Sequence, residues 1–179
     1  MTIVVAVEDP QGVALAWDTA VTDEHNRIDT GVQKAQLVRP WLGLALAGDV
    51  TPGMVLRYEW DPPVEPPRDV ERWVNYELIM EWREILAPWE KKMKYPIEAL
   101  VAFRGAVWCI DDGLSAHRSR RGYSVIGSGT MWAEGALGAL APIRDARAAA
   151  VRSVEVACEH GVGLRAPGGP GCLWVPAWA

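Results

Sequence analysis

Threonine at position 2 is the residue of this chain with the clearest chemical potential, since removal of Met1 leaves a hydroxyl and a free α-amine on one residue. A small residue at position 2 allows a cell to remove the initiator methionine. The threonine hydroxyl is a poor nucleophile, and a neighbouring amine that accepts its proton is one known way to activate it. The sequence therefore supplies a candidate N-terminal nucleophile.

Four further residues could complete a catalytic site around Thr2. Lys34 would place a positive charge beside the hydroxyl and so favour its deprotonation, and Asp18 would hold Lys34 as an ion pair. Gly48, at a predicted strand-to-helix junction, would direct backbone N–H groups at a developing oxyanion, and Ser128 would hydrogen-bond near the amine. Each residue also has an ordinary alternative role. Lys34 could be a solvated lysine and Asp18 a strand-end cap, while Gly48 could be a turn residue and Ser128 a helix N-cap.

Hydrophobic periodicity and turn signals predict the elements that must position these residues. Strands are expected over residues 2–8, 13–18, 33–39, 42–48, 97–104, 106–111, 122–126 and 172–175, and helices over 49–59, 69–87, 130–140 and from Pro142 to about 160. The predicted order along the chain is a group of strands, two helices, a second group of strands, two helices and a last strand. This order indicates an α+β layered fold rather than a parallel sheet. We expect one domain over residues 1–179, with the Pro-rich stretch 61–67 as an ordered loop.

Composition narrows the classes of function. A formal net charge of −5 argues against nucleic acid as a partner, because phosphate binding needs a basic face. No stretch reaches the roughly 18 apolar residues of a membrane span, and the N-terminus lacks a secretory pattern. The scattered cysteines and histidines predict no metal or cofactor site and a reducing, cytoplasmic location.

The candidate site residues, taken together, resemble the β-type subunits of the proteasome family of N-terminal nucleophile hydrolases, which includes the bacterial peptidase HslV. With Thr2 as the first mature residue, the family's positions are matched without a gap at Val7, Gly12, Asp18, Lys34 and Gly48. The segment from Val125 to Gly129 is similar to the strand-to-helix element that carries the family's accessory serine. Met1 alone precedes Thr2, which favours HslV over proteasome subunits with a propeptide.

This resemblance implies a four-layer α/β/β/α sandwich of two antiparallel sheets and a threonine peptidase that works through an acyl-enzyme without a cofactor. It also implies a homo-oligomeric ring, a peptide or unfolded-protein substrate and, by analogy alone, an ATPase unfoldase as partner. Subunit contacts are expected at Trp73, Trp82 and Trp89. The family's specificity pocket would be lined by Val21, Val32, Leu46, Val50 and Met54, and its apolar character predicts an apolar side chain before the cleaved bond. The alternative is that these five residues belong to an ordinary core.

The sequence departs from the family's pattern where an aspartate closes the site, since Glu159 and His160 stand at the matching region. Either residue, or neither, would reach Thr2. An alternative alignment places Met1 at the nucleophile position and needs one extra residue in the turn at Asp9–Gln11. Two other functions stay open: a catalytically inactive structural homologue that forms an oligomer, and a small-molecule amidase of the same fold.

Overall fold

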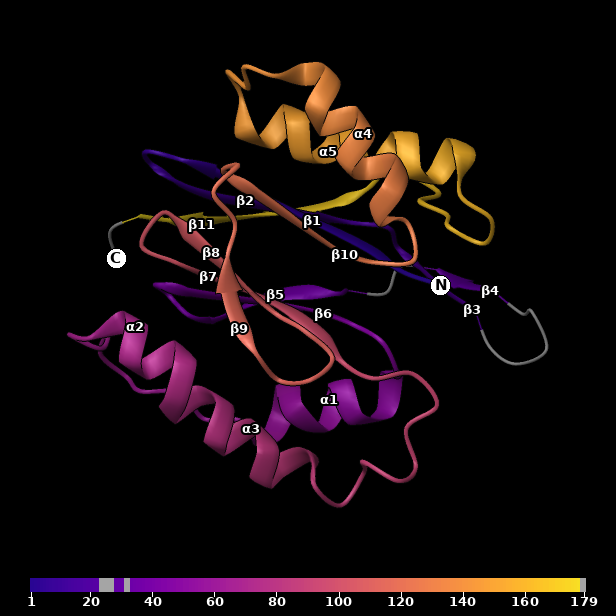
Figure 1. The fold of residues 1–179 in the computed structure, drawn as a ribbon. Coiled ribbons are helices and arrows are strands. Elements are labelled where there is room, and N and C mark those ends of the chain that lie inside the picture. The colour runs from indigo at the N-terminus through magenta and orange to yellow at the C-terminus, as the bar shows by residue number, and fades with distance from the viewer. Residues whose placement is uncertain (23–27, 31–32, 178–179) are drawn as a thin grey trace.

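Two antiparallel sheets lie face to face and helices cover both outer faces, as the computed structural model of residues 1–22, 28–30 and 33–177 shows (Figure 1). One sheet contains β1 (Ile3–Asp9), β2 (Gly12–Trp17), β10 (Tyr123–Gly127) and β11 (Gly171–Pro176). The other contains β5 (Ala35–Arg39), β6 (Leu42–Ala47), β7 (Glu98–Phe103), β8 (Ala106–Ile110) and β9 (Ala116–Arg118). The predicted four-layer α/β/β/α sandwich is confirmed.

All neighbouring strands pair antiparallel, in the order β10-β1-β2-β11 and β5-β6-β7-β8-β9. A separate pair, β3 (Ala20–Thr22) and β4 (Ile28–Thr30), projects beside the N-terminus (Figure 1). The strands β3, β4 and β9 were not predicted, because three residues are too few to show an alternating pattern.

The strand that follows Thr2 is buried on both faces. In β1, Val4 and Ala6 pack between the two sheets, whereas Ile3, Val5 and Val7 pack against the helices. This two-sided burial explains why β1 reads as a continuous apolar run. Because β1 lies between β2 and β10, the candidate nucleophile stands at the head of an interior strand.

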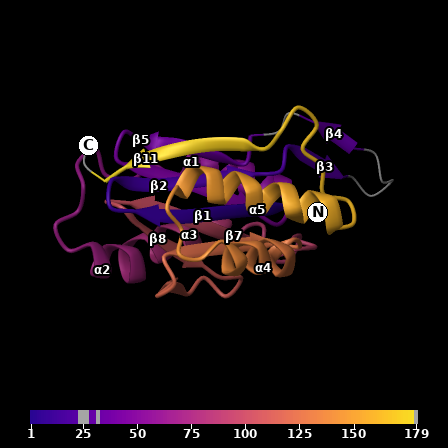
Figure 2. The same cartoon turned by 90° about the horizontal axis from the view of Figure 1, so that it is seen from above.

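Helices α4 (Thr130–Leu140) and α5 (Ala146–His160) cover the four-stranded sheet, and α5 runs across β1 and β2 (Figure 2). Helices α1 (Val50–Glu59), α2 (Val70–Arg72), η1 (Trp73–Leu78) and α3 (Ile79–Leu86) cover the five-stranded sheet. Within the described ranges, no helix has both the length and the apolar character needed to cross a bilayer.

The helix predicted over 69–87 is one helical run whose middle, η1, is π-helical. Buried residues recur there five apart, as Trp73 with Leu78 and Val74 with Ile79. This spacing suits the i→i+5 hydrogen bonds of a π-helix, which keep both pairs on the core side.

The prediction that Pro142 stands in the first turn of the last helix is wrong. Helix α5 begins at Ala146, and the Asp145 side chain caps it by accepting a hydrogen bond from the Ala148 N–H at 3.0 Å. Aspartate satisfies a free N–H of the first turn, which proline at N1 does not do.

Two of the tryptophans expected at subunit contacts are core residues. Trp73 and Trp82 are 1% and 0% exposed, and both pack against Trp60. The face of the helical run that carries Trp73 and Trp82 therefore packs within the subunit. Trp89 is only partly buried.

Candidate active site

The structure brings Thr2, Lys34 and Asp18 together at the end of β1. The Lys34 Nζ donates to the Thr2 Oγ1 at 3.3 Å and to the Asp18 Oδ1 at 2.7 Å. A third hydrogen bond, to the Ala20 carbonyl oxygen at 2.7 Å, uses the last donor of the ammonium. Two acceptors, Asp18 Oδ1 and the Ala20 carbonyl oxygen, therefore hold the ammonium against the threonine hydroxyl.

Asp18 orients the lysine and also ties it to the strand that carries Thr2. It follows β2, is fully buried, and its Oδ1 accepts a hydrogen bond from the Ile3 N–H at 2.8 Å. The ion pair is itself buried, since Lys34 is only 5% exposed. A charge pair shielded from water interacts more strongly than one on the surface, so its geometry is well defined.

Ser128 lies beside the backbone of Thr2. Its Oγ accepts a hydrogen bond from the Thr2 N–H at 3.2 Å and donates to the Thr2 carbonyl oxygen at 3.3 Å. The alternative in which Ser128 caps the next helix is wrong, because Gly129 is the N-cap of α4 and no side chain caps that end.

The glycine before Ser128 explains how β10 approaches so closely. Gly127 has a φ of 95°, and a Cβ built there would lie 2.3 Å from the Thr2 carbonyl oxygen. Its N–H donates to the Glu98 Oε2 of the opposite sheet at 3.0 Å. Only glycine permits this backbone path at low cost, so Gly127 places the serine hydroxyl against Thr2.

Gly48 stands between β6 and α1 and lines the same cavity as Thr2. Its φ is 110°, and a Cβ there would lie 2.2 Å from the Pro96 carbonyl oxygen. The left-handed backbone reverses the chain direction between strand and helix, which a side chain would prevent. The junction predicted from the sequence is thus present next to Thr2.

Burial shifts the pKa values of both amines near Thr2. Burial lowers the pKa of Lys34, and the Asp18 carboxylate opposes this shift. Burial also lowers the pKa of the Met1 α-amine, and the charge of Lys34 lowers it further. Both shifts disfavour a second cation at this end of the sheet, as expected when amines share a partly desolvated site.

A small cavity beside Thr2 matches most of the predicted specificity pocket. Val21, Leu46, Val50 and Met54 line it, together with Gly48, whereas Val32 lies outside the described residues. Sequence reasoning missed three polar residues of the same lining: Gln33, Asp49 and Arg57. Helical spacing could have found Arg57, which stands three residues after Met54 and seven after Val50 on one face of α1.

Glu159 and His160, which stand in the region where the resemblance implied an aspartate, both contact residues other than Thr2. The Glu159 Oε1 accepts a hydrogen bond from Arg152 at 3.1 Å on the surface of α5, and the His160 ring lies 5.3 Å from that of Trp132. The loop that follows them does approach the N-terminus, because a Cβ on Gly163 would lie 2.0 Å from the Met1 Cε.

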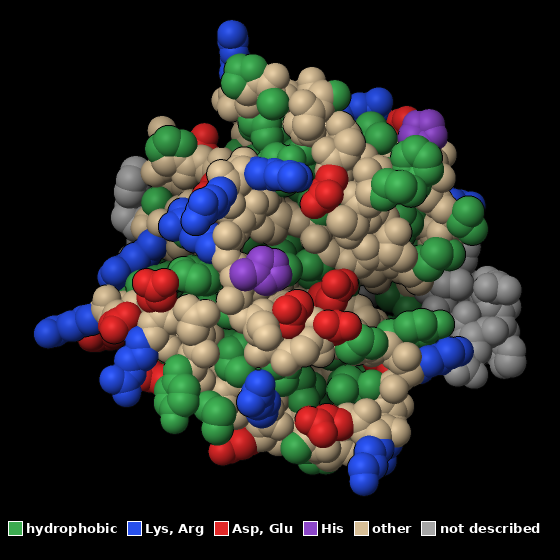
Figure 3. All heavy atoms as spheres, viewed as in Figure 1, with side chains coloured by type: hydrophobic (Ala, Val, Ile, Leu, Met, Phe, Trp, Pro, Cys, Tyr) green, Lys and Arg blue, Asp and Glu red, His purple; other side chains and the backbone are tan. Residues whose placement is uncertain are grey.

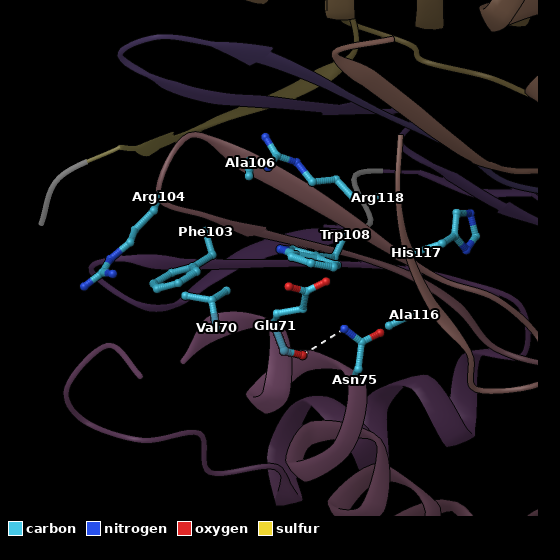
Figure 4. Close-up of a pocket in the computed structure, with 10 residues that line it drawn as sticks. All are labelled: Val70, Glu71, Asn75, Phe103, Arg104, Ala106, Trp108, Ala116, His117 and Arg118. Atoms are coloured by element: carbon cyan, nitrogen blue, oxygen red, sulfur yellow. Dashed lines mark hydrogen bonds between the residues drawn. The ribbon is translucent and has the colours of Figure 1, made fainter. Parts of the chain in front are cut away.

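A larger hollow of about 580 Å³ lies between α2 and the end of the five-stranded sheet (Figure 4). Glu71 and Asn75 line it from the helical side, and Trp108 and Arg118 from strands β8 and β9, whereas the His117 ring at its edge points away from it. None of its lining residues is a serine, threonine or cysteine, so it offers no nucleophile of the kind present at Thr2. Over the described part of the chain, no group of three or more His, Cys, Asp and Glu side chains is placed to hold a metal ion.

Neither a protein-family model nor a curated protein sequence matches the chain. Solved structures do match over nearly its whole length. Thiobacillus denitrificans BPH in complex with epoxomicin has a TM-score of 0.77 at 20% identity, covering 99% of this chain and 100% of that one. A second structure of Thiobacillus denitrificans BPH gives 0.76 at 19%, covering 99% and 98%.

Eukaryotic HslV from Trypanosoma brucei has a TM-score of 0.71 at 17% identity, covering 97% of this chain and 99% of that one. These likenesses show that the chain has an HslV-like fold, as the resemblance implied. The arrangement of Thr2, Asp18, Lys34 and Ser128 is observed in this chain itself and does not depend on these likenesses.

Proposed function

We propose that the protein is an N-terminal threonine peptidase whose nucleophile is the Thr2 hydroxyl, set free once Met1 is removed. The observation that carries this proposal is the 3.3 Å hydrogen bond from the Lys34 Nζ to the Thr2 Oγ1, with Asp18 holding the lysine at 2.7 Å. A solvated lysine or a strand-end cap would have no reason to converge on this hydroxyl.

The reaction follows from that arrangement. The freed α-amine of Thr2 takes the hydroxyl proton while Oγ1 attacks the peptide carbonyl carbon, and the Lys34 charge stabilises the developing negative charge on Oγ1. The backbone at Gly48 stabilises the oxyanion. The amine then returns its proton to the leaving nitrogen, which departs and leaves an ester on Thr2. Water, deprotonated by the same amine, attacks the ester and releases the acid, restoring Thr2.

Ser128 has a positioning role in this proposal. Its hydroxyl already contacts the Thr2 nitrogen at 3.2 Å, so it would hold the freed amine beside the hydroxyl of the same residue. Fixing the orientation of a general base lowers the entropic cost of proton transfer.

Assembly of several copies into a ring is part of the proposal. The fold is shared with HslV, and the surface over α4 carries apolar side chains, as the space-filling view shows (Figure 3). Met131, Trp132 and Leu140 on this helix are 73%, 40% and 41% exposed. Exposed apolar side chains on one helix are typical of subunit contacts. Light scattering would give a mass several times the 19.7 kDa of one chain. An ATPase partner stays a prediction of the resemblance.

Epoxomicin, which is bound in the structure of Thiobacillus denitrificans BPH, provides the test of Thr2. Its epoxyketone reacts with a hydroxyl and an amine on the same residue. Intact-mass measurement is expected to show loss of Met1 and then one covalent adduct for each chain. The Thr2→Ala variant is expected to form none, and Thr51→Ala, at an exposed position of α1, to react like the wild type.

Two results would overturn the proposal. A wild-type chain that has lost Met1 but forms no adduct would indicate an inactive homologue. Turnover of small amides without cleavage of any peptide, by a monomer, would indicate a small-molecule amidase.

A further inference from the structure

The cavity beside Thr2 follows one face of α1. Asp49, Val50, Gly53, Met54 and Arg57 line it at spacings of one, three, one and three residues, which is the pattern of a single helix face. Arg57 stands eight residues after Asp49, about 12 Å along the helix axis at 1.5 Å per residue. The cavity therefore has apolar walls and a guanidinium at its Arg57 end.

This guanidinium has unused binding capacity. Arg57 is half-buried, and its Nη1 donates to the Gln33 carbonyl oxygen at 2.9 Å. Its Nε is buried without a hydrogen-bond partner, and no carboxylate pairs with the guanidinium in the part of the chain that the structure describes. A half-buried guanidinium without an acid can still take a charged ligand, and a buried N–H left without an acceptor favours one.

The other charges of the cavity are already engaged. Lys34 is committed to Asp18 at 2.7 Å. The Asp49 Oδ2 accepts a hydrogen bond from the Lys94 backbone N–H at 2.6 Å. Arg57 is therefore the cation of the lining that no carboxylate pairs with, over the residues that the structure describes.

The size of the cavity limits that group. Its volume is about 60 Å³, enough for about four water molecules at about 15 Å³ each. This space suits a side chain of four or five non-hydrogen atoms, as in leucine, aspartate or glutamate, better than the larger ring of phenylalanine or tryptophan.

We propose that Arg57 is a specificity-determining residue and that this cavity takes an acidic side chain, glutamate above all, on the acyl side of the cleaved bond. The inference rests on the proposed function and replaces the apolar preference expected from the sequence. The methylenes of a glutamate contact Val50 and Met54, and its carboxylate forms a charge-assisted pair with the Arg57 guanidinium.

Four fluorogenic peptide amides that differ only in the residue before the scissile bond provide the test: glutamate, glutamine, leucine and phenylalanine. Glutamine matches glutamate in shape, so their ratio isolates the charge. Wild-type kcat/KM is expected to favour glutamate over glutamine at least tenfold, and less so in high salt, which screens the pair. Phenylalanine is expected to be the poorest.

The Arg57→Met variant keeps an unbranched apolar chain and removes the charge, and its glutamate-to-glutamine ratio is expected to fall below about twofold. Arg57→Lys is expected to retain part of the ratio, which guards against a folding defect in the first variant. Arg83→Met, at an exposed position of α3, is the matched control and is expected to keep the wild-type ratio.

The outcomes separate this inference from the proposed function. If epoxomicin modifies Thr2 but the glutamate peptide has no advantage or is not cleaved, the inference is wrong and the peptidase proposal stands. An unchanged ratio in Arg57→Met also overturns it. If no peptide is cleaved and Thr2 stays unmodified, both are wrong.

Discussion

The ammonium of Lys34 has one donor for each of three acceptors, and two of the three belong to a framework that cannot easily move. Asp18 is fully buried, and the Ala20 carbonyl belongs to β3. The third acceptor is the hydroxyl that we propose to be reactive. A lysine held in this way serves two purposes, because it neutralises a buried carboxylate and directs its charge at the nucleophile.

Replacement of Lys34 separates these two purposes. Lys34→Met is expected to lower kcat/KM by at least 100-fold. It is also expected to lower the free energy of unfolding by about 3–5 kcal/mol, because Asp18 is left as an unpaired buried charge. Adding Asp18→Asn is expected to restore most of the stability without restoring activity. Urea denaturation and peptide turnover on the single and double variants provide the measurement, and an active Lys34→Met variant would contradict the proposed role.

The pH dependence reports on the amine. An α-amine ordinarily has a pKa of about 7.7–8.0, and burial and the charge of Lys34 lower the pKa of the Met1 α-amine. The same two causes are expected to act on the Thr2 amine that removal of Met1 sets free beside Lys34. This amine must be neutral to accept the hydroxyl proton, so kcat/KM is expected to rise with pH, with its midpoint below the ordinary value of about 7.7–8.0. A profile that still rises above pH 9 would show that the working base is another group.

The residues predicted most accurately lie on or next to rigid strands. Thr2 precedes β1, Asp18 follows β2 and Lys34 precedes β5, so a gapless register was enough to bring them together. Arg57 could not be assigned in the same way. A charged residue on a helix normally faces water, and only the packing of α1 against the sheet turns it into the cavity.

At the scale of elements, the junction between β6 and α1 depends on one glycine. Gly48→Ala would bring a Cβ to 2.2 Å from the Pro96 carbonyl oxygen at a φ of 110°. We expect a loss of about 1–3 kcal/mol of stability and a larger loss of kcat/KM, because the backbone that we propose to bind the oxyanion must move. Thermal denaturation and turnover measure the two effects.

Gly138→Ala is the matched control for that substitution. Gly138 lies in α4, and a Cβ there meets nothing within 4 Å. This variant is expected to gain about 0.5–1 kcal/mol, because alanine is the better helix former, and to leave turnover unchanged. Equal effects of the two alanines would show that the junction tolerates a side chain.

The long elements were predictable because their apolar periodicity extends over many residues. The β3–β4 pair was not, since three-residue strands carry no pattern and are defined by their partners. The start of α5 was misplaced because two helix signals compete in one segment. Pro142 is a common first-turn residue, but Asp145 caps the helix instead.

At the scale of the whole molecule, an aromatic cluster between the five-stranded sheet and its helices stabilises the fold. Trp41, Trp60, Trp73, Trp82 and Phe103 meet at centroid distances of 4.9–6.4 Å. The ten tryptophans were evident in the composition, but the sequence could not tell core from contact surface. That distinction depends on which residues of the helical run face the sheet, and the π-helical turns decide it.

Truncation of one tryptophan tests how much this cluster contributes to the free energy of unfolding. Trp82→Ala is expected to lower the free energy of unfolding by about 3–5 kcal/mol, since a fully buried ring leaves a cavity. Tyr76→Ala, at a residue of the same helical run that is 59% exposed, is expected to cost less than about 1 kcal/mol. Both are measured at one protein concentration, because assembly makes stability concentration-dependent. A mild effect of Trp82→Ala would contradict the assignment of this core.

Chain ends usually fray before the rest of a protein melts. Here the first strand lies between two neighbours, and Ile3 to Ala6 have no exposed surface. The end of the chain that we propose to be reactive is therefore expected to stay in place until the sheet itself melts. Thermal inactivation and cooperative melting of the sheet are expected to follow one curve, and a purification tag is best fused at the opposite terminus.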